Sequence, residues 1–166
     1  MELNRQIQTL VEESAGYGIA PIVIQKAIAP VLLLVAQQLE HSEYYIMQNL
    51  REDWVISVIS GRENSEFSHS KPNSKLQNSE KKVIYGFVTV KDAKNFSSNR
   101  EPDLVAISLP IIQILFRVFS LQQIDSIIFF PQSENTTKGI EVKRRQLQNS
   151  IQEKLQQLKT IPRDLA

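Results

Sequence analysis

The stretch from Leu104 to Phe130, LVAISLPIIQILFRVFSLQQIDSIIFF, constrains the fold more than any other part of the chain. Proline suits the first turn of a helix, where its missing N–H has no partner, so we predict a helix from Pro110 to Ser120. Apolar side chains occupy most of the circumference of this helix, which predicts that it is covered on more than one face. The continuous apolar run after it predicts a central strand from Ile124 to Phe130, buried on both faces.

Further segments extend this unit. The sequence VIYGFVTV predicts a strand from Val83 to Val90, and the helix then connects it to the strand from Ile124 to Phe130 as a parallel crossover. The short segment from Gly139 to Val142 predicts an edge strand. A final amphipathic helix is predicted by apolar residues at helical spacing, namely Leu147, Ile151, Leu155 and Leu158.

The N-terminal part of the chain is predicted to be helical. An apolar stripe at helical spacing predicts an amphipathic helix from Glu2 to Ser14. The stripe consists of Leu3, Ile7, Leu10 and Val11. Because proline can open a helix, we expect further helical segments over Pro21–Ala27 and Pro30–Glu40. The second of these is apolar nearly all round at its start, as expected of a core or interface helix.

The residues between these two parts divide into a β-rich segment and a polar segment. The β-rich segment indicates a hairpin with strands Tyr44–Leu50 and Trp54–Ser60. The polar segment from Gly61 to Lys82 is dominated by Ser, Asn, Lys and Glu. Such a composition buries too little apolar surface to offset the entropy of ordering, so we expect a mobile loop.

A chain of 166 residues fits a single α+β domain, with residues 1–40 as a helical subregion. We expect N-terminal helices followed by a mixed four- or five-stranded sheet, built from an antiparallel hairpin and one parallel crossover, with helices packed on it. Absence of cysteine excludes disulfides and thiolate chemistry and fits the cytoplasm. The N-terminal residues lack the apolar core of a signal peptide, so we do not expect export.

The sequence carries none of the common motifs for phosphate cradles, metal sites or activated nucleophiles. No cofactor, metal ligand or catalytic residue is therefore predicted, and a protein without enzymatic activity is favoured. An enzyme would have to combine Asp125, Asp92 or Glu141 with His41 in a shared cleft. The alternative is that these side chains are helix caps and loop polar groups.

The densest basic cluster is Lys143-Arg144-Arg145, where a predicted strand gives way to a helix. Free N–H groups at a helix start attract anions, so these residues and Arg117 are candidates for binding an anion or an acidic partner. A solvated charged face is the alternative. The net charge of +1 does not favour nucleic acid, and the charge-free run from Leu104 to Phe116 is shorter than the roughly 20 residues of a membrane span.

The N-terminal helices offer more apolar surface than one small sheet needs. The stripe residues Leu3, Ile7, Leu10 and Val11, together with Leu32, are therefore candidate interface residues. Because two-fold dimers are the commonest soluble oligomers, we expect a homodimer through these helices. Tyr44 and Trp54 are candidate contact residues, since such side chains give a large contact area with a polar tip, or else they pack in the core.

These patterns favour a non-enzymatic protein-interaction module, such as an adaptor, assembly factor or regulator. It would self-associate through its N-terminal helices and offer a sheet face or the basic corner to another protein. The alternative is a regulatory domain that binds a small molecule or anion between the sheet and the helix Pro110–Ser120, with Arg117, Arg144 or Arg145 as counter-ions. An enzyme of unknown class that uses carboxylates is the third hypothesis.

Overall fold

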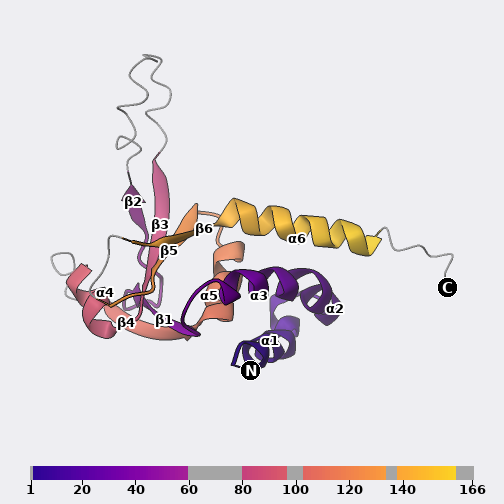
Figure 1. The fold of residues 1–166 in the computed structure, drawn as a ribbon, viewed down its shortest axis with the longest axis horizontal. Helices are drawn as coiled ribbons and strands as arrows, with labels where there is room; N and C mark the ends of the chain where they lie inside the picture. Colours follow the sequence, from indigo (N-terminus) through magenta and orange to yellow (C-terminus); the bar gives the residue numbers. More distant parts are fainter. Residues whose placement is uncertain (1, 60–79, 97–102, 134–137, 160–166) are drawn as a thin grey trace, which may run out of the picture.

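The computed structural model describes residues 2–59, 80–96, 103–133 and 138–159 and has an α+β fold (Figure 1). Its centre is a six-stranded sheet in the order β4-β1-β3-β5-β6, with β2 paired to β3. The strands are β1 Glu43–Gln48, β2 Ser57–Ile59, β3 Lys81–Phe87, β4 Val105–Pro110, β5 Ser126–Phe130 and β6 Ile140–Lys143. The predicted fold class, N-terminal helices followed by a mixed sheet with helices packed on it, is confirmed.

The strand that ends the Leu104–Phe130 stretch occupies the position predicted for it. β5 lies between β3 and β6, parallel to β3 and antiparallel to β6. Ile127 and Phe129 have no exposed surface, while Phe130 on the opposite face is 6% exposed. A continuous apolar run is required here because both faces of β5 are buried. The predicted parallel crossover is therefore present.

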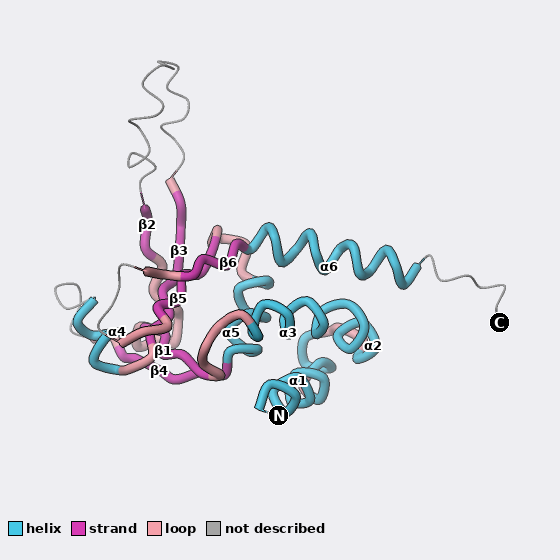
Figure 2. Tube along the Cα trace, viewed as in Figure 1, coloured by secondary structure: helices cyan, strands magenta, loops and turns pink. Residues whose placement is uncertain are grey.

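One face of the sheet is buried under helices, and we call it the covered face (Figure 2). Sheet residues such as Ile46, Ile84 and Phe129 form one core with helix residues such as Leu32 and Leu115. The helices on this side are α1 Glu2–Glu12, α2 Pro21–Val23, α3 Ala29–Gln37, α5 Ile111–Ser120 and α6 Arg144–Lys159. The N-terminal helices thus belong to the main core of the chain.

The two helical segments predicted around Pro21 and Pro30 form one nearly continuous helical run. A π-helical turn, Ile24–Ile28, joins α2 to α3. Pro30 lies in the first turn of α3, where it has no N–H to donate to the preceding turn. By length and composition the stretch Pro21–Gln38 could cross a membrane, but 39% of it is buried in this structure and core helices meet the same criterion.

The predicted hairpin is present only at its turn. The Asn49 amide N–H donates to the Asp53 carbonyl at 2.9 Å, and an isolated bridge pairs Gln48 with Trp54. After Trp54 the predicted second strand of the hairpin separates from β1. Its later residues form β2, which pairs antiparallel with β3. β1 cannot keep it as a partner because β3 and β4 occupy both edges of β1.

β4, which was not predicted from the sequence, pairs with the full length of β1. The register runs from Glu43 opposite Pro110 to Gln48 opposite Val105. Pro110, expected inside the helix, instead ends β4 and caps α5 in an extended conformation. Most of the loop predicted over Gly61–Lys82 lies outside the described residues, and its last two residues belong to β3.

A buried glutamine ties α1 to the rest of the fold. The Gln6 side-chain amide donates to the Ser42 carbonyl at 3.0 Å, and its carbonyl oxygen accepts the Ile112 amide N–H at 2.9 Å. The second bond satisfies an N–H at the start of α5 that has no partner inside that helix. Gln6 is 7% exposed, so its side-chain amide depends on these bonds within the fold.

Replacing Gln6 with alanine is therefore expected to lower the free energy of unfolding by about 1–3 kcal/mol, because the buried Ile112 N–H loses its partner. The Ser42 carbonyl keeps the Ile111 amide N–H as a donor. Gln8→Ala is the matched control, since Gln8 lies on the exposed side of the same helix and bonds only to Glu12. Urea denaturation of both variants measures the difference. Equal losses in the two variants would contradict the role assigned to Gln6.

Candidate functional site

The second face of the sheet, which we call the open face, carries one short helix in the described part of the chain, α4 Val90–Phe96. Register places side chains from β1, β3, β4, β5 and β6 on this face, because cross-strand partners point to the same side. They include Tyr45, Met47, Lys81, Tyr85, Phe87, Ala106, Ile128, Phe130, Glu141 and Lys143, together with the fully buried Val83 and Ser126. The open face is therefore apolar in its centre and charged at the end formed by β3 and β6.

Aromatic rings form the centre of the open face. Phe96, from the last position of α4, has its ring centroid 4.6 Å from that of Tyr85, 5.3 Å from Phe87 and 5.8 Å from Phe130. Phe87 and Phe130 are almost fully buried, whereas Phe96 is 39% exposed. One ring of the cluster is thus available to solvent.

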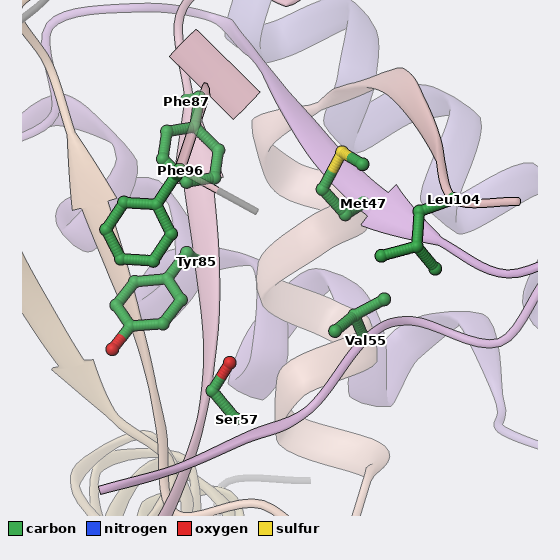
Figure 3. A pocket seen from close by; sticks show the side chains of 7 residues that line it. All are labelled: Met47, Val55, Ser57, Tyr85, Phe87, Phe96 and Leu104. Carbon is green, nitrogen blue, oxygen red and sulfur yellow. The ribbon is translucent and has the colours of Figure 1, made fainter. Parts of the chain in front are cut away.

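A hollow opens beside this cluster (Figure 3). Tyr85, Phe87 and Phe96 form one wall, and Met47, Val55 and Leu104 form the other. The Ser57 hydroxyl points into the space between them, and the Tyr85 hydroxyl points away. The volume of the hollow is about 30 Å³, the share of one water molecule, so it does not take up a drug-sized ligand.

The charged end of the open face is organised around Glu141. Its carboxylate forms an ion pair with the Lys81 ammonium, and Lys143 lies two residues further along β6 on the same face. Burial alone would raise the pKa of Glu141, but the ion pair with Lys81 and the charge of Lys143 lower it below its usual value. Two cations and one carboxylate leave this end with a net positive charge.

The basic residues named from the sequence do not form one cluster. Lys143 lies on the open face, whereas the backbone N–H of Arg144 donates to the Asp125 carbonyl at 2.9 Å and Arg145 is exposed on α6. Arg117 lies on α5, with its guanidinium carbon 4.4 Å from the centroid of the Trp54 ring. A cation–π contact therefore occupies Arg117 on the covered face.

The predicted interface residues are packed within the chain. Leu10 and Leu32 are in the main core, and Leu3, Ile7 and Val11 pack against it. Tyr44 is fully buried against Phe129, and burial raises the pKa of Tyr44 to about 12. Trp54 is 6% exposed. The homodimer through N-terminal helices stays a prediction, and the large apolar side chains that those helices expose are Tyr17, Ile22 and Leu34.

The residues required for an enzyme lie apart. His41 makes a hydrogen bond to the Pro131 carbonyl after the end of β5, whereas Asp125 precedes the start of β5 and accepts the Lys82 amide N–H. Asp92 is buried in α4, and its amide N–H is capped by the Thr89 hydroxyl. No group of three or more His, Asp or Glu side chains that could hold a metal ion occurs among the described residues.

The space predicted between the sheet and α5 is filled by core side chains. A second hollow, of about 220 Å³, lies instead between α1 and the start of α5. Its polar lining includes the carboxylates of Glu2 and Glu13 and one cation, Arg5, which pairs with Glu2 at 3.7 Å. This lining does not favour an anion.

The aromatic cluster was not predicted from the sequence. Alternation in β3 already places Tyr85 and Phe87 on one face with Lys81, and this signal was available in the sequence. The contribution of Phe130 depends on the pairing register of β3 and β5, and that of Phe96 on the packing of α4. Neither is encoded in a local pattern.

Comparisons with models of known protein families and with curated proteins found no match.

Proposed function

We propose that this protein is a non-enzymatic interaction module that binds a segment of another protein on the open face of its sheet. The observation that carries the proposal is the contrast between the two faces: helices that share one core with the sheet bury the first, while a single seven-residue helix packs on the second among the described residues. An apolar centre beside a polar rim is typical of protein-binding surfaces.

The chemistry of the open face defines the partner. The exposed ring of Phe96 beside the hollow suits contact with one aromatic side chain of a partner. Lys81 already pairs with Glu141, so Lys143 supplies the unbalanced positive charge that suits a carboxylate. Lys81 precedes Tyr85 by four positions on β3, so these two residues lie about 13 Å apart at 3.3 Å per residue. An extended segment with an aromatic residue four positions from an acidic residue matches that spacing.

The test uses two synthetic extended peptides that differ in one residue. One carries tryptophan and glutamate four positions apart, and the other has lysine in place of glutamate. NMR spectra of the isotope-labelled full chain are expected to shift at Ser57, Tyr85 and Leu104 with the glutamate peptide. Lys143→Glu is expected to reverse the preference between the two peptides, because it inverts the local charge.

Leu104→Asp is expected to weaken binding of the glutamate peptide by about tenfold or more, since it places a charge in the apolar hollow. Leu34→Asp is the matched control, because Leu34 is 61% exposed on α3, away from the open face. The proposal fails if both variants bind equally well. It also fails if a short oligothymidine, with salt-dependent affinity, shifts the same residues while neither peptide does.

A further inference from the structure

The outer edge of β4 has no partner strand among the described residues. β1 occupies its inner edge over six residue pairs, and the strand lies at the rim of the molecule (Figure 1). Val105, at its start, is 42% exposed. An edge strand presents a row of N–H and C=O groups that can pair with another chain.

The hydrogen bonds around β1 identify which backbone groups of β4 face outward. The Ile111 amide N–H donates to the Ser42 carbonyl on the β1 side at 2.9 Å, while the Met47 carbonyl accepts the Val55 amide N–H on the other side of β1. In an antiparallel pair these directions alternate along the strand. The N–H and C=O groups of Ala106 and Ser108 therefore point away from β1.

The position of Pro110 agrees with this alternation. Pro110 is the last residue of β4 and shares its parity with Ala106 and Ser108, so its missing N–H falls on the outer edge. Proline is tolerated in a sheet where its N–H would face solvent. The outward direction of Ala106 and Ser108 thus follows from two separate features.

Apart from Pro110 at its end, β4 lacks the features with which edge strands usually avoid pairing. No charged residue occurs from Leu104 to Phe116, and no Lys, Glu or Asp interrupts the strand itself. The opposite edge of the sheet differs, because β6 is a four-residue strand that carries Glu141 and Lys143. Charged side chains and short length protect β6, and neither protects the longer β4.

We propose that two copies of this chain pair antiparallel along β4, with Ile107 on the two-fold axis. In this register Ala106 of one copy faces Ser108 of the second copy, and these outward-pointing residues exchange both hydrogen bonds. Val105 then faces Leu109 of the second copy on the covered side of the sheet. An uncharged strand suits self-pairing, because no like charges meet across the axis.

The dimer joins two sheets into one and leaves the open face of each copy free, so it is independent of the proposed peptide-binding function. Pairing of one short strand buries less than the roughly 1,200 Å² of a standard interface. It is therefore expected to dissociate on dilution.

Single cysteine variants test the register, since the natural chain contains no cysteine. The two copies of Ile107 form a non-hydrogen-bonded pair with Cα atoms about 4.5 Å apart, within the range of a disulfide. The two copies of Val105 lie about 13 Å apart, outside that range. Mild oxidation is expected to give a disulfide-linked dimer several times faster for Ile107→Cys than for Val105→Cys.

Random collision predicts the opposite order, because Val105 is the more exposed of the two side chains. Equal rates, or faster crosslinking of Val105→Cys, would overturn the proposal. Val58→Cys, on the exposed edge strand β2, gives the background rate of crosslinking for an exposed residue.

A second pair of variants tests the dimer without cysteine. Ser108→Pro removes an outward N–H, and Ser108→Ala removes only the hydroxyl, which bonds to Glu43 at 3.0 Å. Light scattering is expected to show a concentration-dependent mass for the natural chain and Ser108→Ala, and a monomer for Ser108→Pro with an unchanged circular dichroism spectrum. The same mass for both variants, or a natural chain that is monomeric at every concentration, would overturn the proposal.

Discussion

Deletion of residues 1–40 is expected to unfold the chain instead of releasing a folded sheet. The deleted segment contains Leu10, Ile24 and Leu32, which are buried in the main core with the sheet and α5. Each fully buried side chain of this kind contributes about 1.5–3 kcal/mol, and a domain of this size has a net stability of only about 5–15 kcal/mol. Loss of these helices would also expose the apolar side of α5. Circular dichroism and the fluorescence of Trp54 are expected to lose their cooperative thermal transition.

Two leucines in α3 provide a matched pair of point variants for the same conclusion. Leu32 has no exposed surface, whereas Leu34 is 61% exposed two positions later. Leu32→Ala is expected to cost about 2–5 kcal/mol, and Leu34→Ala is expected to have a small effect. A truncated chain that keeps its β-sheet spectrum and melts cooperatively would contradict this result. It would return the N-terminal helices to the role of a separate docking unit.

The sequence predicts the N-terminal helices but does not reveal where they dock. The stripe that contains Leu10 has the same chemistry whether it meets a second subunit or the sheet of its own chain. The apolar area of the covered face determines whether the stripe packs within its own chain. That area is larger than expected because β4 adds a strand to the sheet. The six residues of β4 are uncharged and lie directly before the apolar helix α5, so the sequence does not mark where the strand ends and the helix begins. Pro110 does not resolve this boundary, because proline suits the end of an edge strand as well as the start of a helix.

The open face shows a similar division between local and long-range information. Alternation along β3 places Lys81, Tyr85 and Phe87 on one face and can be predicted from the sequence. The register of β3 against β5 brings Phe130 into the cluster, and no local pattern fixes that register. The basic run at residues 143–145 is divided because the chain changes there from strand to helix, which rotates successive side chains differently.

Phe129→Ala is expected to cost about 3–5 kcal/mol of the free energy of unfolding. Phe129 is fully buried on the covered face, with its ring centroid 4.7 Å from that of Tyr44. Its ring also fills the space left by Gly86, where an added Cβ would lie 2.8 Å from the Phe129 Cδ1 atom. Gly86→Ala alone is therefore expected to cost about 1–3 kcal/mol, because the ring must move within a packed core.

The two changes are expected to be less than additive when combined. Removal of the Phe129 ring removes the atom that the Gly86→Ala methyl group would meet, so the second substitution becomes cheaper in the Phe129→Ala chain. Gly16→Ala is the control, since no atom lies within 4 Å of a Cβ added there. Urea denaturation of the single and double variants measures the coupling. Strict additivity would show that Gly86 and Phe129 do not pack against each other, and that the close approach of β3 and β5 does not depend on glycine at this position.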